Sequence, residues 1–145
     1  MHEFDYKNHK INPNQFEAKT ENYKTFYDWL HSVIQPWNLS DKLINKIDLC
    51  AEEIFVNISL YAYSEKTGTI EVSINKKDNK IILKFTDTGF AYNPLEKPDP
   101  DITLPPEQRQ PGGLGIYMIK QAAENVSYER NDNKNILTMT FNCNE

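Results

Sequence analysis

The stretch from Leu49 to Tyr63 places an acid and an amide in an otherwise apolar segment. Glu53 and Asn57 are four positions apart, so on a helix they are neighbours separated by one turn. Apolar residues recur around them at three- and four-residue intervals and predict a buried helix face: Leu43, Ile47, Cys50, Ile54, Ile58 and Tyr61. At about 100° per residue, Glu53 and Asn57 fall at the edge of this row, where the buried face meets a cavity or solvent.

The role of this pair stays open on its own. An Asn at a helix edge is more commonly a structural amide than a metal ligand. A surface ion pair is not favoured for Glu53, because Leu49 and Asn57 rather than basic residues lie one turn away from it. Glu52, the adjacent acid, lies about 100° away around the helix and is expected to face outward.

A second polar set, Asp87-Thr88-Gly89-Phe90-Ala91, follows a predicted strand. Gly89 can adopt backbone angles that other residues resist, and it lets a ligand approach closely. A carboxylate accepts hydrogen bonds, so Asp87 at the mouth of the strand could bind the exocyclic amino group of adenine. The alternative is that Asp87 caps a turn, as Asp-x-Gly often does.

Gly112-Gly113-Leu114-Gly115 precedes a predicted helix, and backbone N–H groups at a helix start favour anionic oxygens. A flexible hinge is the alternative. The segment lacks the Lys-Ser or Lys-Thr of a P-loop, and it does not follow a strand as a Rossmann fingerprint does. Arg109, in the preceding loop, could bring a positive charge to a terminal phosphate or be a solvated loop residue.

The composition indicates one domain. The chain has 145 residues, enough for a proper core, so we expect a single domain over residues 1–145. The formal net charge of −5 and the scattered lysines indicate no binding of nucleic acid. The N-terminus lacks the apolar run of a signal peptide and no apolar stretch has membrane length, so we expect a cytoplasmic protein. Cys50 and Cys143 have no metal-type spacing and are expected to be reduced and structural.

Helices and hairpins must position these residues. The pattern predicts a helix from Thr20 to Ile34 that Pro36 ends, and a long helix that begins at Ser40 and Asp41 and runs to about Tyr61. Alternation predicts strands over 69–75 and 80–86, and a closing hairpin of 125–130 and 135–141. An extended segment within residues 4–19 and a short helix after Gly115 complete the set.

These elements predict an α+β fold, a two-layer α/β sandwich with helices on one face of a mainly antiparallel mixed sheet. The segment 90–111 holds six of the eight prolines, and an irregular loop of that length is usually functional or mobile. Trp29 and Trp37 belong either to the core, the commoner fate of Trp, or to a homodimer or partner surface.

Taken in order, Glu53-x-x-x-Asn57, Asp87-x-Gly89-x-Ala91, the proline-rich loop and Gly113-x-Gly115 resemble the N, G1 and G2 boxes of the GHKL ATPases, which have the Bergerat fold. The resemblance spans about residues 20–141. Within that superfamily, the short length and the segment from Asn57 to Tyr63 are similar to the anti-sigma regulatory factor serine/threonine kinases of partner-switching systems. Tyr61 stands where many members carry His.

The resemblance implies a site for ATP and Mg²⁺. Asn57 would bind Mg²⁺ through its amide oxygen, and Glu53 would be the general base toward the attacking hydroxyl. Asp87 would bind the adenine amino group, and residues 92–111 would close as a lid. The residues implied to bind the nucleotide are Asn57, Asp87, Gly89, Ala91, Arg109, Gly112, Gly113, Leu114 and Gly115.

The implied function is an ATP-dependent protein kinase that phosphorylates Ser or Thr of a small antagonist protein and sequesters a sigma factor. The alternative is a non-catalytic module that binds ATP or ADP and controls a partner by association; retention of Glu53 favours the enzyme. A detached catalytic domain of a histidine kinase is a third interpretation. It is not favoured, because the sequence has no room for a dimerisation helix pair with a phosphoacceptor His.

Overall fold

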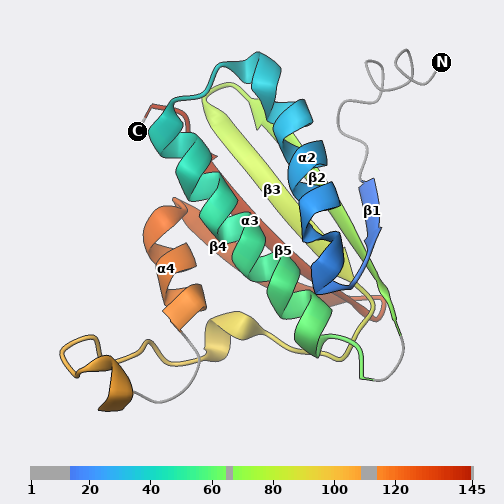
Figure 1. The fold of residues 1–145 in the computed structure, drawn as a ribbon, viewed down its shortest axis with the longest axis vertical. Helices are drawn as coiled ribbons and strands as arrows, with labels where there is room; N and C mark the ends of the chain where they lie inside the picture. Colours follow the sequence, from blue (N-terminus) through green and yellow to red (C-terminus); the bar gives the residue numbers. More distant parts are fainter. Residues whose placement is uncertain (1–13, 65–66, 109–113, 145) are drawn as a thin grey trace.

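The computed structural model describes residues 14–64, 67–108 and 114–144, which form two layers (Figure 1). Within these residues the sheet has five strands, and three α-helices lie on one of its faces. The strands are β1 (Asn14–Glu17), β2 (Thr69–Lys77), β3 (Lys80–Asp87), β4 (Asn125–Asn131) and β5 (Lys134–Asn142). The helices are α2 (Tyr23–Ile34), α3 (Asp41–Tyr61) and α4 (Leu114–Ala122). The predicted α+β sandwich is confirmed.

The sheet has the order β1-β2-β3-β5-β4. Within the described residues every strand pair is antiparallel, with no parallel pair. Alternate side chains of the three central strands are buried beneath the helices: Ile70, Val72, Ile74, Ile81, Leu83, Phe85, Leu137, Met139 and Phe141. Asp87 and Asn135 are register partners that continue these inward rows at the end of β3 and the start of β5. The pairing therefore puts two polar side chains at the edge of an apolar layer.

Both hairpins close through Asp and Asn residues in the left-handed region. The φ angles are 55° at Asp78, 51° at Asp132 and 63° at Asn133. These residue types tolerate positive φ better than most, and such turns match the twist of the strands they join. The strands therefore extend further toward the turns than the alternation predicts, to Lys77 in the first hairpin and from Lys134 in the second.

Helix α3 has the predicted bounds. The Ser40 hydroxyl caps it by accepting a hydrogen bond from the backbone N of Leu43 at 3.1 Å. The predicted apolar row is buried as far as Ile54 and partly buried at Ile58. The placement of Tyr61 in that row is wrong, because the helix ends there beyond the core and leaves this side chain 67% exposed. Neither α3 nor any other helix of residues 14–64, 67–108 and 114–144 combines the length and apolar character needed to cross a membrane.

Aromatic side chains form the contact between α2, α3 and the sheet. The Phe26 and Phe55 rings stack with centroids 4.8 Å apart and planes inclined by 15°. Trp29 and Trp37 are partly buried and pack against this core, and Trp29 meets the Phe16 ring edge to face at 5.6 Å. Both tryptophans therefore contribute to the packing of the core and keep part of their surface exposed.

The two cysteines are free thiols, Cys50 in the core and Cys143 partly buried at the end of the described chain. Burial raises the pKa of the Cys50 thiol to about 12. A thiol that stays protonated is a poor nucleophile, which agrees with the structural role expected for it.

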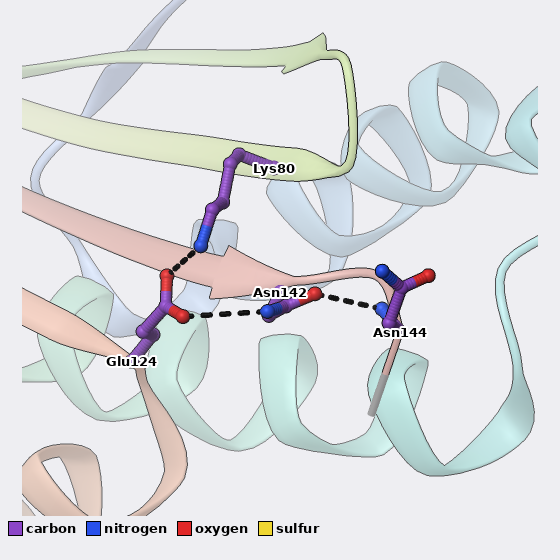
Figure 2. A network of polar contacts seen from close by, with 4 residues as sticks. All are labelled: Lys80, Glu124, Asn142 and Asn144. Atoms are coloured by element: carbon purple, nitrogen blue, oxygen red, sulfur yellow. Dashed lines mark hydrogen bonds and ion pairs between the residues drawn. The ribbon is translucent and has the colours of Figure 1, made fainter.

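An exposed polar network joins the segment after α4 to the sheet (Figure 2). The Lys80 ammonium contacts Glu124 Oε1, and Asn142 Nδ2 donates to Glu124 Oε2 at 3.4 Å. The backbone N of Asn144 donates to Asn142 Oδ1 at 2.8 Å. The backbone N of Glu124 donates to the Thr140 carbonyl at 2.8 Å. These contacts fix the point at which the chain leaves α4 and enters β4.

The hydrogen bond from Lys80 lowers the pKa of the Glu124 carboxyl below its ordinary value of 4.5, and the bond from Asn142 acts in the same direction. A carboxyl whose folded-state pKa is depressed stabilises the fold above its unfolded pKa, and this stabilisation is lost as the pH falls through the folded pKa. We therefore expect Glu124→Gln to unfold more readily than the native chain at neutral pH, and the difference to shrink below about pH 4.5. Urea unfolding of the two proteins across this range, with the exposed Glu129→Gln as control, measures it.

Candidate functional site

Glu53 lies where α3 meets the start of α4. A Cβ atom added to Gly115 would be only 2.1 Å from the Glu53 carboxyl carbon, so position 115 has no room for a side chain. Glu53 is partly buried, whereas Glu52 is exposed as predicted. The absence of a side chain at Gly115 therefore allows the carboxylate of one helix to rest against the first turn of another.

Burial raises the pKa of the Glu53 carboxyl above its ordinary value, and the negative charge of Glu52 adds to the increase. A carboxylate with a raised pKa is a stronger base than an exposed one, and a catalytic base works best when its pKa approaches the working pH. The Glu53 carboxylate can therefore take a proton from a hydroxyl group placed beside it.

A cavity opens between the C-terminal half of α3, the end of the sheet and the loop after β3. Its walls are mostly apolar or aromatic, and its lining consists of Ile54, Asn57, Ile58, Tyr61, Ala62, Phe85, Asp87, Phe90, Tyr92, Pro94, Tyr128, Asn135 and Leu137. Asn57 and Asp87, which the sequence places on separate elements, thus line one cavity. An apolar pocket with a few polar groups is typical of a site for a flat organic ligand.

Asp87 is the buried carboxylate of this cavity, with 5% of its surface exposed. Its Oδ1 accepts a hydrogen bond from the backbone N of Gly89 at 2.9 Å and another from Asn135 Nδ2 at 2.9 Å. The first bond is the turn contact that the sequence offered as an alternative role. The carboxylate both closes this turn and lines the cavity, so the two interpretations are compatible.

Gly89 fits tightly against the end of α3. A Cβ atom there would lie 2.1 Å from the Ala62 carbonyl oxygen, and the backbone N of Phe90 donates to that oxygen at 2.9 Å. The Gly89 carbonyl accepts from Arg130 Nη1 at 2.9 Å. The absence of a side chain at Gly89 is therefore needed for the loop to pack on the helix end, a reason the sequence did not reveal.

Ala91 precedes the segment 92–111 that is predicted to close as a lid. It lines a second, open hollow with Tyr92, Asn93, Glu96, Lys97, Pro98 and Tyr128. Residues 92–108 contain two 3-10 turns, Pro94–Glu96 and Pro106–Gln108. Buried Pro94 lines the main cavity, and Asp99 accepts from Lys120 Nζ of α4 at 3.1 Å. Figure 1 shows this segment at the same end of the molecule as the start of α4 and the end of α3.

Three predicted site residues, Arg109, Gly112 and Gly113, lie outside the described residues. Leu114 and Gly115 begin α4, and Leu114 is 44% exposed. The described part of the site therefore brings Glu53 to the α4 start, and Asn57 and Asp87 to the cavity.

The structure adds Asn135 and Tyr128, which were not predicted from the sequence. Asn135 is 7% exposed, and its Oδ1 accepts hydrogen bonds from the Tyr128 hydroxyl and, at 3.3 Å, from the backbone N of Tyr92. The alternation of β5 could have indicated Asn135, because it lies two positions before the buried Leu137 and so faces the same side of the sheet. A polar residue on that buried side is unusual. The contact with Asp87 depends on strand register and could not be found from local pattern.

Comparison with known proteins gives one family. The sequence profile described as "Histidine kinase-like ATPase domain" matches residues 16–141. The chain is similar to serine/threonine-protein kinase BtrW of Bordetella bronchiseptica, with 28% identity over 113 residues that cover 77% of this chain and 80% of BtrW. It is similar to serine-protein kinase RsbW of Bacillus thuringiensis, with 28% identity over 102 residues that cover 68% of this chain and 64% of RsbW. The second match thus spans less than two thirds of that relative.

Two solved structures share the fold. The RsbU and RsbW domains of a Mycobacterium tuberculosis protein match with a TM-score of 0.59 and 12% identity, covering 90% of this chain and 32% of that one. The histidine kinase AdeS of Acinetobacter baumannii matches with a TM-score of 0.50 and 16% identity, covering 96% of this chain and 72% of that one. At these identities the likeness concerns the fold alone.

Proposed function

Because this chain belongs to the histidine kinase-like ATPase domain family, we propose that it is an ATP-dependent protein kinase that phosphorylates Ser or Thr. The relatives named as serine or serine/threonine protein kinases support this reaction class. The substrate in this proposal is a small antagonist protein, and a sigma factor is the second partner. We place the reaction in the cytoplasm.

One observation carries the proposal. The Glu53 carboxylate packs against Gly115 at the start of α4, while Asn57, one turn further along α3, lines the cavity that holds Asp87. A base, an amide oxygen and a buried carboxylate thus follow one another from the α4 start to the cavity. This order matches that of the parts of ATP, whose reacting phosphate would lie near Glu53 and whose purine would lie near Asp87.

The cavity suits the purine. Its apolar and aromatic lining can cover a flat ring, and the Asp87 carboxylate can accept a hydrogen bond from the exocyclic amino group of adenine. The phosphates then extend toward the start of α4, because the N–H groups in the first turn of a helix have no partner within the helix and favour anions. Residues 92–111 close over the nucleotide in this proposal.

Asn57 is the residue we assign to Mg²⁺. Within residues 14–64, 67–108 and 114–144, no group of three or more His, Cys, Asp or Glu side chains is arranged to hold a metal ion. An amide oxygen with a carboxylate one turn away fits an ion that arrives with ATP, since Mg²⁺ usually takes one or two protein ligands and completes its shell with phosphates and waters. When bound, Mg²⁺ offsets the negative charge of the phosphate oxygens.

Glu53 acts on the protein substrate. Its carboxylate takes the proton of the Ser or Thr hydroxyl as the hydroxyl oxygen bonds to the γ-phosphorus. The bond from that phosphorus to the bridging oxygen breaks, and ADP leaves with the electron pair. The contact with Gly115 holds the carboxylate beside the helix start, where this proposal places the γ-phosphate and the attacking hydroxyl.

Transfer of labelled γ-phosphate from ATP to recombinant antagonist proteins of the same organism tests the proposal, with mass spectrometry to locate the modified residue. We expect one of these proteins to be labelled on Ser or Thr. If ATP binds but no antagonist protein is labelled, the chain is instead a nucleotide-binding module that acts by association.

A further inference from the structure

Asn135 joins three parts of the cavity. It is the first inward residue of β5, 7% exposed, and its register partner on β3 is Asp87. Its Nδ2 donates to Asp87 Oδ1 at 2.9 Å and to the Phe90 carbonyl at 2.7 Å, while its Oδ1 accepts from the Tyr128 hydroxyl and from the backbone N of Tyr92. The amide is thus bonded to the end of β3, to the loop that follows it and to β4.

The partners fix the orientation of the amide. The Phe90 carbonyl and the Asp87 carboxylate can only accept, so the NH₂ end of Asn135 must face them. The oxygen end then faces Tyr128 and the Tyr92 amide, and the Tyr128 hydroxyl must donate its single proton to it. No alternative arrangement of protons satisfies all four contacts.

This arrangement determines which hydrogen-bonding groups remain for a ligand. Asp87 Oδ1 is occupied by the Gly89 N–H and the Asn135 amide, whereas Asp87 Oδ2 has no hydrogen-bond partner in the described part of the chain. Among the described residues, the side-chain atoms that lack both solvent contact and a hydrogen-bond partner are Ser59 Oγ and Asn75 Oδ1. Asp87 Oδ2 is not one of them, so it is accessible to solvent and open to a ligand. Tyr128 has already used its proton. These two residues can therefore offer a ligand only acceptors.

We infer that Asn135, held by Tyr128, is a positioning residue that determines base specificity. Its hydrogen bonds use up the Tyr128 proton and Asp87 Oδ1, so these side chains present only acceptors to a ligand. The cavity therefore accepts a purine with an exocyclic amino group and excludes one with a carbonyl at the same position. A carbonyl there would face the Asp87 carboxylate with no proton between the two oxygens, and leaving such buried groups unpaired weakens binding. The inference rests on the proposed function, because it requires that the cavity takes the base of ATP.

ATP and ITP test the inference, since inosine differs from adenosine by a carbonyl in place of the amino group and by a proton on the adjacent ring nitrogen. We expect the native chain to bind ATP about ten- to a hundredfold more tightly than ITP. Asn135→Asp keeps the shape of the side chain but removes two donors and places a second carboxylate against Asp87, so the two must share protons. The ATP preference of this variant should fall to about threefold or less.

Tyr128→Phe provides a milder change that keeps the ring. It removes one of the two groups that orient the Asn135 oxygen, and we expect a smaller loss of the ATP preference in the same direction. Asn125→Asp adds the same charge at an exposed position on β4 and should retain the native ratio of dissociation constants. Isothermal titration of all four proteins with both nucleotides provides the ratios.

The outcomes separate this inference from the proposed function. A folded native chain that binds neither ATP nor ITP contradicts the proposed function itself. A native chain that prefers ATP, with either the Asn135→Asp or the Tyr128→Phe variant showing the native preference, contradicts the role of Asn135. If the variants bind ATP and ITP more weakly by the same factor, Asn135 has a purely structural role, and the inference is overturned.

Discussion

Replacing Glu53 by Gln is expected to slow phosphoryl transfer by about a hundred- to ten-thousandfold and to leave the affinity for ATP near the native value. The amide keeps the size of the side chain and its place against Gly115, but it cannot take the proton of the attacking hydroxyl. Single-turnover transfer of labelled phosphate measures the first effect, and calorimetry measures the second.

The Glu53→Gln variant should be at least as stable as the native chain. The raised pKa of Glu53 means that its ionised form is disfavoured by folding, so a neutral side chain removes a penalty at neutral pH. Loss of transfer in a chain of native stability thus identifies a chemical role. Unchanged transfer in Glu53→Gln would show that another group accepts the proton.

Glu52→Gln is the matched control. Glu52 is exposed and should not touch the reacting hydroxyl, so the rate at neutral pH should stay close to native. Its charge helps to raise the pKa of Glu53, and the native rate should fall as the pH drops through that pKa, which lies above the ordinary value of 4.5. Removing the charge of Glu52 should therefore shift this fall of the rate to lower pH. In Glu53→Gln the rate should no longer fall over this pH range.

Replacing Asp87 by Asn is expected to weaken ATP binding by about a hundredfold, or about 2.8 kcal/mol. The Gly89 N–H and the Asn135 amide both donate to Oδ1, so the oxygen of the new amide must stay there and its NH₂ group must replace Oδ2. The cavity then presents donors to the amino group of adenine. For the same reason the variant should bind ITP more tightly than the native chain does.

Asp132→Asn serves as the control for this exchange. Asp132 lies in the β4–β5 turn with φ of 51°, a conformation that Asn adopts readily, and it makes the same change of charge outside the cavity. Isothermal titration with ATP and ITP gives both affinities. If Asp87→Asn binds ATP as tightly as Asp132→Asn does, the cavity does not bind the amino group through Asp87.

Local patterns were sufficient for the helix that carries Glu53 and Asn57. The Ser40 cap and the apolar row gave α3 its bounds, and the same period placed Glu52 outward and Glu53 at the edge. Each of these features depends on residues within a few turns of one another. The prediction for Tyr61 failed because helical period does not indicate where the covering layer ends.

The surroundings of Asp87 depend on contacts that no local pattern contains. Asn135 meets Asp87 through the register of β3 with β5, and Tyr128 reaches Asn135 through the register of β4 with β5. Those registers are set by packing of the whole sheet. The close approach of Gly89 to Ala62 likewise depends on how the loop after β3 returns to the end of α3.

We propose that this chain holds ATP together with Mg²⁺ through Asn57, and calorimetric titration of ATP is the decisive measurement. Titrations of the native chain with and without Mg²⁺, and of Asn57→Ala with Mg²⁺, are sufficient. We expect binding that requires Mg²⁺ in the native chain and is lost in Asn57→Ala, while the thermal unfolding of the two proteins stays similar. Absence of ATP binding by a folded native chain would contradict the claim, as would Mg²⁺-dependent binding that Asn57→Ala retains in full.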